Sequence, residues 1–126
     1  SMLSAFLLCK AFGLDEAVTM SMLPKSVTTP IAMSLSEELG GITSVTVAVV
    51  IATGIMGSIL APTLIKVFHV KSPIAAGVAI GTCSHAIGTS RAMQLGEIEG
   101  AMSGIAIGVS GLLTMILALL YHSMMM

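Results

Sequence analysis

The sequence has little charge and few aromatic side chains. Its 126 residues include five Lys or Arg and six Asp or Glu, which make up 9% of the chain, and Trp is absent. A soluble globular domain carries about 25% charged residues, so these side chains are too few to cover a water-facing surface. The formal net charge of −1 also offers no basic face to nucleic acid. These shortages argue against a water-soluble fold and a nucleic-acid partner, and they predict an integral membrane protein surrounded by lipid.

Motifs for catalysis or metal binding are also missing. The two cysteines, Cys9 and Cys83, have no CxxC or Cys/His spacing, and we expect both to be apolar helix side chains. Ser84 and His85 are adjacent, but adjacent side chains on a helix diverge and do not form a catalytic pair. We therefore expect no enzyme activity, no metal and no cofactor. The apolar start has neither a basic n-region nor a cleavage site, so we expect a fragment rather than a signal peptide.

The chain does contain long apolar segments. Residues 42–65 and 100–121 carry no charged side chain, and about 20 apolar residues cross a bilayer as a helix. Each of these spans also has closely spaced small residues, which predict a stripe for tight helix packing. They are Gly54, Gly57 and Ser58 in the first span, and Gly100, Gly104 and Gly108 in the second.

Two further segments are apolar but interrupted by polar residues, glycine or proline. Residues 14–39 contain Lys25 between two prolines, and residues 72–95 contain His85 among Gly, Ser and Thr. Each predicts a half-helix, a polar break and a second half-helix. A half-helix of about 10 residues rises about 15 Å, half the hydrocarbon thickness. A broken helix that crosses the membrane and a re-entrant hairpin both fit these lengths, and the charge pattern mildly favours crossing.

The two interrupted segments are related by a shift of 60 residues. The shift aligns identical residues at Thr29/Thr89, Ala32/Ala92, Met33/Met93, Leu35/Leu95, Glu37/Glu97 and Gly40/Gly100. We predict an all-α transmembrane domain over residues 1–126, with repeat 1 at 14–68 and repeat 2 at 72–122. Each repeat is a broken helix followed by an intact transmembrane helix. Matching interrupted helices in two repeats point to a transporter binding site.

Polar side chains in the two breaks are the candidate binding residues. We expect Thr29 to cap a half-helix that begins at Pro30, so that its N–H groups and positive dipole end face the first break. Lys25 adds a full charge there, and a charge at membrane depth is a functional candidate by default. The second break places His85 opposite Lys25, with Thr89 as a possible cap. The candidates for binding a small carboxylate anion between the two broken helices are Lys25, Ser26, Thr28, Thr29, Ser84, His85, Thr89 and Arg91.

The three candidates with basic side chains also have structural interpretations. Lys25 could extend its ammonium group to the membrane surface if its hairpin is shallow. His85 could make an interhelical hydrogen bond, and Arg91 could pair with Glu97 or Glu99 or anchor the chain at the interface.

Three segments closely resemble the LrgB/CidB family of membrane proteins. They are residues 23–32 (LPKSVTTPIA), 37–41 (EELGG) and 81–92 (GTCSHAIGTSRA), and the similarity runs from about Leu3 to Leu120. Family members are longer, and this chain resembles their C-terminal half. Ser90 departs from the Ala expected in relatives, which is a conservative change.

The resemblance implies two kinds of function in a multi-pass protein of the bacterial cytoplasmic (inner) membrane. Related proteins exchange glycolate and glycerate in plastids or are linked to pyruvate movement in bacteria. Bacterial members are also described as holin- or antiholin-like proteins that modulate murein hydrolase activity and autolysis. We expect a carrier of small monocarboxylates. The alternative is an antiholin-like regulator that acts through membrane oligomerisation. The expected partners are lipid, further copies of the chain and a separate small holin-like membrane protein.

Overall fold

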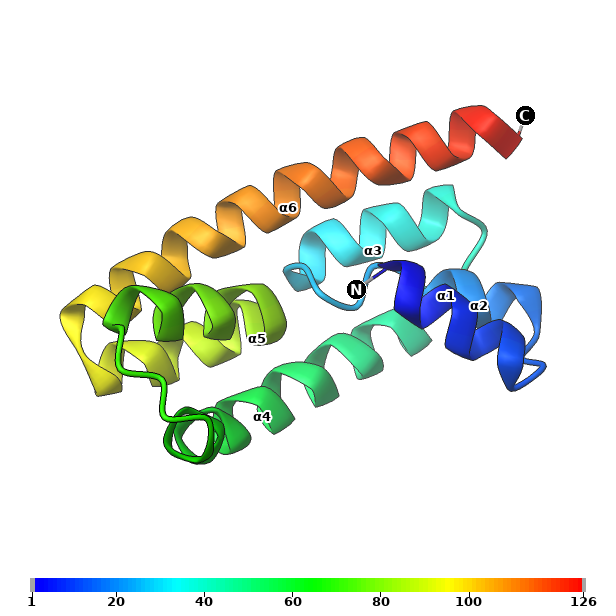
Figure 1. The fold of residues 1–126 in the computed structure, drawn as a ribbon. Helices are drawn as coiled ribbons and strands as arrows, with labels where there is room; N and C mark the ends of the chain where they lie inside the picture. Colours follow the sequence, from blue (N-terminus) through cyan, green and yellow to red (C-terminus); the bar gives the residue numbers. More distant parts are fainter. Residues whose placement is uncertain (1, 126) are drawn as a thin grey trace. The chain divides into compact units, whose positions relative to one another are not determined.

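The computed structural model describes residues 2–125, with the side chains of 121, 122, 124 and 125 left out, and over this range all elements of regular secondary structure are helices (Figure 1). Residues 1 and 126 of the predicted domain lie outside the described range. The helices are α1 (Met2–Ala11), α2 (Glu16–Met22), α3 (Thr29–Glu38), α4 (Thr43–Val67), α5 (Pro73–Leu95) and α6 (Glu97–Met125). The all-α prediction is confirmed.

Two of these helices are long and apolar enough to cross a membrane. They are Thr43–Val67, which is the whole of α4, and Glu97–Leu120 within α6. Both predicted spans therefore fall inside single helices. α4 continues through Pro62 to Val67, because a proline inside a helix removes one hydrogen bond without having to end it.

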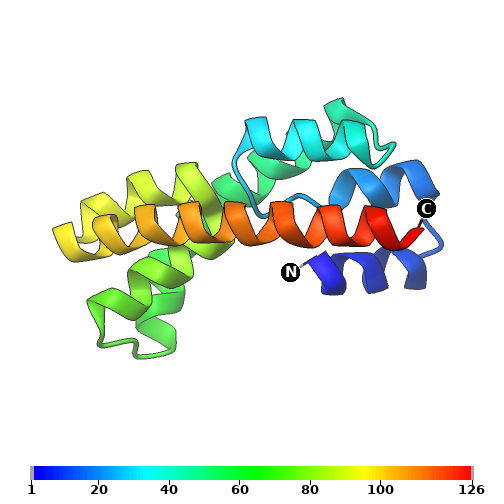
Figure 2. The ribbon, with the colours of Figure 1, turned by 90° about the horizontal axis from the view of Figure 1, so that it is seen from above.

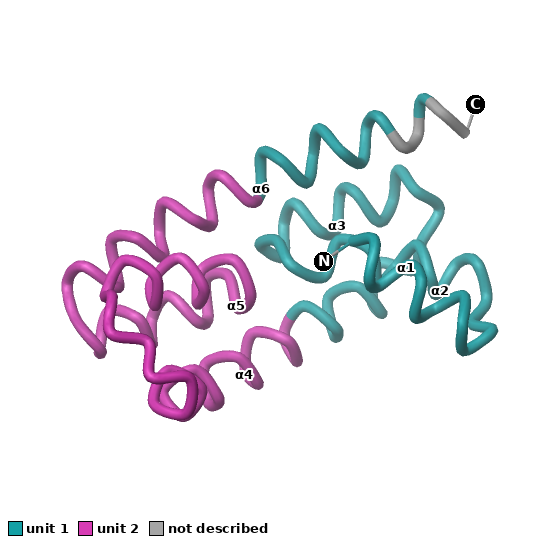
Figure 3. Tube along the Cα trace, in the orientation of Figure 1, with its two compact units in different colours: residues 1–50, 111–126 teal, residues 51–110 magenta. Residues whose placement is uncertain are grey.

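The chain forms two compact units, which are coloured separately in Figure 3. Unit 1 contains residues 1–50 and 111–126, and unit 2 contains residues 51–110. The boundaries fall inside α4 and α6 and do not follow the predicted repeats 14–68 and 72–122. The repeat therefore stays a prediction, and each unit is described by itself.

In unit 1, α2 and α3 run in opposite directions and form a helical hairpin around residues 23–28 (Figures 1 and 2). Ser21 of α2 and Ser36 of α3 both contact Thr46 at the start of α4. On one continuous helix, residues 21 and 36 would lie about 22 Å apart. The reversal at 23–28 is therefore what brings the two serines to the same threonine.

In unit 2, α5 is itself a hairpin, because its two halves run in opposite directions in both views (Figures 1 and 2). His85 has non-helical backbone angles, φ 39° and ψ −138°, at the reversal. Ile80 and Ala92 pack in one apolar cluster with Ala61 of α4, although 12 residues on a straight helix span about 18 Å. The backbone of α5 therefore turns back at His85, and whether this segment crosses the membrane or re-enters it stays a prediction.

At three connections, a residue with a positive φ angle follows the end of a helix. Gly13 (φ +65°) follows α1, Gly40 (φ +74°) follows α3, and His69 (φ +51°) follows α4. After α3, the Gly41 N–H donates to the Ser36 carbonyl at 2.7 Å, and after α4 the Val70 N–H donates to the Ile65 carbonyl at 3.0 Å. These bonds satisfy carbonyls that have no partner inside the helix and fix where each hairpin or span begins.

Candidate functional site

The 23–28 segment joins α2 to α3 and carries most of the polar candidates of unit 1. Pro24 and Val27 are buried, whereas Lys25, Ser26 and Thr28 are partly exposed. The Lys25 ammonium donates to the Ser26 hydroxyl at 3.5 Å, the limit of a hydrogen bond. Among the described residues, no carboxylate lies within ion-pair distance of Lys25. Its charge therefore remains available to an anion.

The amino end of α3 faces this segment, one residue earlier than we predicted. The N-cap is Thr28 (φ −64°, ψ 149°), so Thr29 is the first helical residue and Pro30 the second. The prediction of Thr29 as cap was wrong by one position, because proline is accepted throughout the first turn, where N–H groups lack helical partners anyway. The Thr28 side chain makes no capping hydrogen bond, so it does not neutralise the positive end of the helix.

Buried hydroxyl groups fasten this hairpin to α4. Ser21, Ser36 and Thr46 have no exposed surface. The Thr46 hydroxyl donates to the Ser21 carbonyl at 2.9 Å and lies 2.7 Å from the Ser36 hydroxyl oxygen. The Ile42 N–H donates to the Ser21 hydroxyl at 2.6 Å. Because these bonds join α2, α3 and α4, they hold the 23–28 segment against a long apolar helix.

The hairpin tip of α5 is tightly packed against α4 in unit 2. Ser84 and His85 are each 2% exposed. A methyl group added at Gly54 of α4 would lie 2.9 Å from His85 Cε1 and 2.8 Å from Ile87 Cδ1, and one added at Gly57 would collide with the Ser84 side chain. The predicted small-residue stripe is confirmed for Gly54 and Gly57. Because neither has a side chain, the tip of the α5 hairpin can pack directly against α4.

The remaining candidates of unit 2 have roles that the sequence did not predict. The Thr89 hydroxyl donates to the His85 carbonyl at 3.0 Å and lies 2.7 Å from the Ser103 hydroxyl of α6, so Thr89 joins two helices instead of capping one. Arg91 is exposed, and its Nη1 donates to Gln94 Oε1 at 2.6 Å. Over the described side chains Arg91 forms no ion pair with a glutamate, so that alternative is not observed.

The structure thus distributes the candidates between its two units. Lys25, Ser26, Thr28 and Thr29 lie together at the hairpin of unit 1, and Ser84, His85, Thr89 and Arg91 belong to α5 of unit 2. Among the described side chains, no three of His, Cys, Asp or Glu form a group that could hold a metal ion.

Within the described residues, only part of the glycine stripe predicted on the second span contacts another helix. Gly104 and Gly108 of α6 are exposed and have nothing within 4 Å of an added methyl group. The face of α6 that packs against α5 instead contains Ser103 and Ala106, which lie against Gly81. The spacing of Gly77 and Gly81 could have identified this contact in the sequence, because glycines four apart share one face of a helix.

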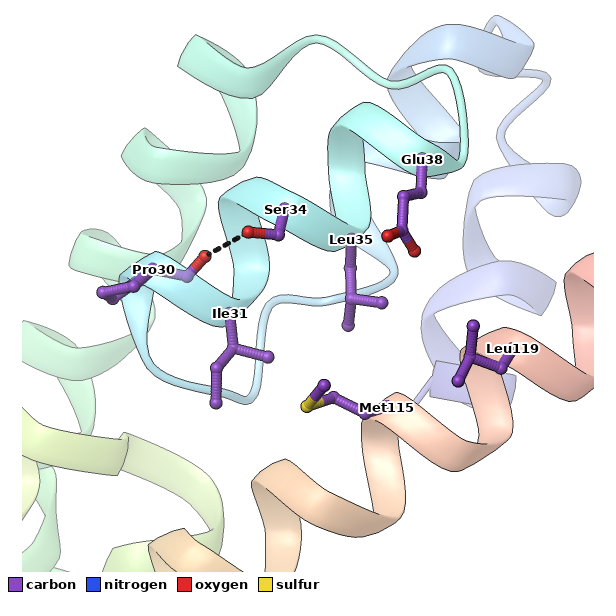
Figure 4. Close-up of a pocket in the computed structure, with 7 residues that line it drawn as sticks. All are labelled: Pro30, Ile31, Ser34, Leu35, Glu38, Met115 and Leu119. Atoms are coloured by element: carbon purple, nitrogen blue, oxygen red, sulfur yellow. Dashed lines mark hydrogen bonds between the residues drawn. The ribbon is translucent and has the colours of Figure 1, made fainter.

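Unit 1 also contains a groove that the sequence did not reveal, with a volume of about 340 Å³ (Figure 4). It runs between α3 and the last turns of α6. Its lining residues are Pro30, Ile31, Ser34, Leu35 and Glu38 of α3, and Met115 and Leu119 of α6. The carboxylate of Glu38 is the one ionic group in this lining.

Comparisons with known proteins agree on one family. The sequence profile of the LrgB-like family matches residues 1–124. Proteins named "Antiholin-like protein LrgB" from Bacillus cereus (strain B4264) and Bacillus anthracis (strain A0248) are each 43% identical over 116 residues, which cover 92% of this chain and 50% of the relative. The chain spans about half the length of the curated relatives it matches. No solved structure matches the chain.

Proposed function

The chain belongs to the LrgB-like family, and we propose that it acts as part of an antiholin-like protein that restrains murein hydrolase activity and autolysis. The observation that carries this proposal is the 43% identity to proteins named antiholin-like LrgB over 92% of the chain. We place it in the bacterial cytoplasmic membrane as a multi-pass protein, with α4 and α6 as the crossing helices.

The open glycines of α6 supply a way to act through assembly. Gly104 and Gly108 lie four residues apart and are uncovered in the chain. Small residues at this spacing let two membrane helices approach closely, so their van der Waals contacts and Cα–H···O contacts can drive association. We propose that a further copy of the chain, or a separate small holin-like membrane protein, packs here.

The test is the autolysis rate of cells that depend on this protein. Gly104→Leu places a bulky side chain on the open face of α6, and we expect it to abolish the restraint on autolysis while the protein still inserts into the membrane. Ala52→Leu is the matched control, because Ala52 is exposed on the other spanning helix, α4. If cells with either variant lysed at the same rate as wild-type cells, the exposed face of α6 would have no part in the function.

A second function, carriage of small monocarboxylates such as glycolate, glycerate or pyruvate, is favoured by Lys25. This lysine is partly buried in an apolar chain, lies beside the uncapped amino end of α3, and has no carboxylate partner among the described residues. A carboxylate at this position would accept hydrogen bonds from Lys25 and Ser26. The part that Ser84, His85, Thr89 and Arg91 would take in this binding stays a prediction.

The repeat on which the carrier interpretation depends has support from equivalent packing. Ser21 contacts Thr46 in unit 1, and Gly81 lies against Ala106 in unit 2, which are the same positions under a shift of 60 residues. We therefore propose that each repeat contains a re-entrant hairpin and one crossing helix. Backbone without helical hydrogen bonds at membrane depth must be buried in protein or line a cavity, as transporter hairpins do.

Uptake of labelled glycolate into proteoliposomes tests the carrier. We expect Lys25→Ala to lower uptake about tenfold or more, since a hydrogen bond to a charged group contributes about 1.5–3 kcal/mol. Lys66→Ala is the control, because Lys66 is an exposed lysine at the end of α4. Uptake that is unchanged in Lys25→Ala would exclude this lysine from binding. The two functions are compatible, because Gly104 and Lys25 lie on different segments of the chain.

A further inference from the structure

We propose that the groove between α3 and α6 of unit 1 holds one acyl chain of an aminophospholipid whose ammonium group binds the Glu38 carboxylate (Figure 4). The lipid is a structural ligand of this leaflet and is distinct from any transported solute.

The walls of the groove suit a hydrocarbon chain. Ile31 and Leu35 of α3 face Met115 and Leu119 of α6 across it. The Ser34 hydroxyl already donates to the Pro30 carbonyl at 3.2 Å, so it needs no polar ligand. Filling the groove with methylenes would cover apolar surface and leave no buried polar group without a partner.

The end of the groove at Glu38 suits a cation. In Figure 4 the Glu38 side chain extends from the last turn of α3 toward the groove. Glu37 is adjacent, and the carboxyl end of α3 adds the negative end of its dipole. No Lys or Arg lies within ion-pair distance of Glu38 among the described residues. A cation with N–H donors would form charge-assisted hydrogen bonds here, whereas a quaternary ammonium has no donor.

The depth of the groove matches that of a lipid in one leaflet. The spanning part of α4 begins at Thr43, five residues after Glu38, so Glu38 would lie near the membrane surface. From Glu38 to Pro30 the helix rises about 12 Å, close to half of the roughly 30 Å hydrocarbon core. A head group at Glu38 would therefore direct its acyl chain along α3 toward the middle of the bilayer.

The combination of apolar walls and one terminal carboxylate favours a lipid over a small polar ligand. A free amine would fill the end at Glu38 and leave the apolar walls empty.

Native mass spectrometry of the protein released from mixed nanodiscs tests this proposal. With equal phosphatidylethanolamine, phosphatidylcholine and phosphatidylglycerol, we expect the ethanolamine lipid to be retained about tenfold more than either of the others. Glu38→Gln should remove this preference, while Glu16→Gln, an exposed carboxylate elsewhere in unit 1, should keep it. Met115→Trp, which fills the groove, should lower the retention of all three lipids.

Several results would overturn the proposal. Equal retention of the ethanolamine and choline lipids by the wild type would exclude recognition of the ammonium group. A preference that survives in Glu38→Gln would place the head group elsewhere, and full retention in Met115→Trp would place the acyl chain elsewhere. Displacement of the lipid by soluble ethanolamine would assign the site to a free amine.

Discussion

Single glycines determine how closely the hairpin of α5 approaches α4. Gly57 has no room for a methyl group because Ser84 occupies the space, whereas Gly104 faces open space. The sequence predicted both as members of packing stripes, and the structure confirms this for Gly57, whereas for Gly104 it stays a prediction. Spacing identifies a face of small residues, but it does not show whether the partner belongs to the same chain.

Gly57→Ala should destabilise the protein by about 1–3 kcal/mol, because the added methyl group overpacks the contact with Ser84. Gly104→Ala should be neutral or stabilise by up to about 1 kcal/mol, since alanine is the better helix residue and meets nothing. Thermal unfolding in detergent, followed by helix content, measures both. A Gly57→Ala protein as stable as the wild type would contradict the packing of the hairpin tip.

Thr46→Val should cost about 1–3 kcal/mol, because it removes the hydroxyl that joins Ser21 and Ser36 in a buried site and leaves their polar groups unsatisfied. Thr82→Val is its control. The Thr82 hydroxyl bonds to carbonyls of its own helix, at Val78 and Ala79, so its loss should change stability little. If both variants lost the same free energy of unfolding in this experiment, the hydrogen bonds of Thr46 with Ser21 and Ser36 would stabilise the protein no more than a bond within one helix.

At the scale of helices, the positions of the interruptions could be predicted but their geometry could not. Prolines around Lys25 and the Gly/Ser/Thr-rich stretch around His85 marked both breaks in the sequence. After a break, the backbone can continue in the same direction or turn back. In α5 this depends on the backbone angles of one residue, φ 39° and ψ −138° at His85, and on contacts such as Gly88 with Ile80. Tertiary contacts of this kind leave no periodic signal in the chain, so the direction of the backbone after His85 could not be predicted from the sequence.

The hairpin form of α5 predicts that both of its ends lie on one side of the membrane. In a background with Cys9→Ala and Cys83→Ala, single cysteines at Lys71 and Gln94 should react with a membrane-impermeant maleimide from the same side of sealed vesicles. Glu38→Cys should react from the opposite side, because α4, the proposed crossing helix, lies between positions 38 and 71. Labelling of positions 71 and 94 from opposite sides would mean that α5 crosses the membrane.

For the whole molecule, composition predicted a membrane protein, because 9% charged residues cannot cover a soluble surface, and the uncharged runs predicted the two long apolar helices. The function depends on features that composition does not determine. The open glycines of α6 favour assembly, and the available charge of Lys25 favours anion binding. The match to LrgB proteins over 92% of the chain gives the antiholin-like function the stronger support.

One measurement separates these functions most directly: the rate of detergent-induced autolysis in cells that carry Gly104→Leu or Lys25→Ala in place of the wild-type protein. The account predicts that Gly104→Leu speeds autolysis to the rate of cells without the protein, while Lys25→Ala keeps the wild-type rate. Fast autolysis with Lys25→Ala and a wild-type rate with Gly104→Leu would contradict it.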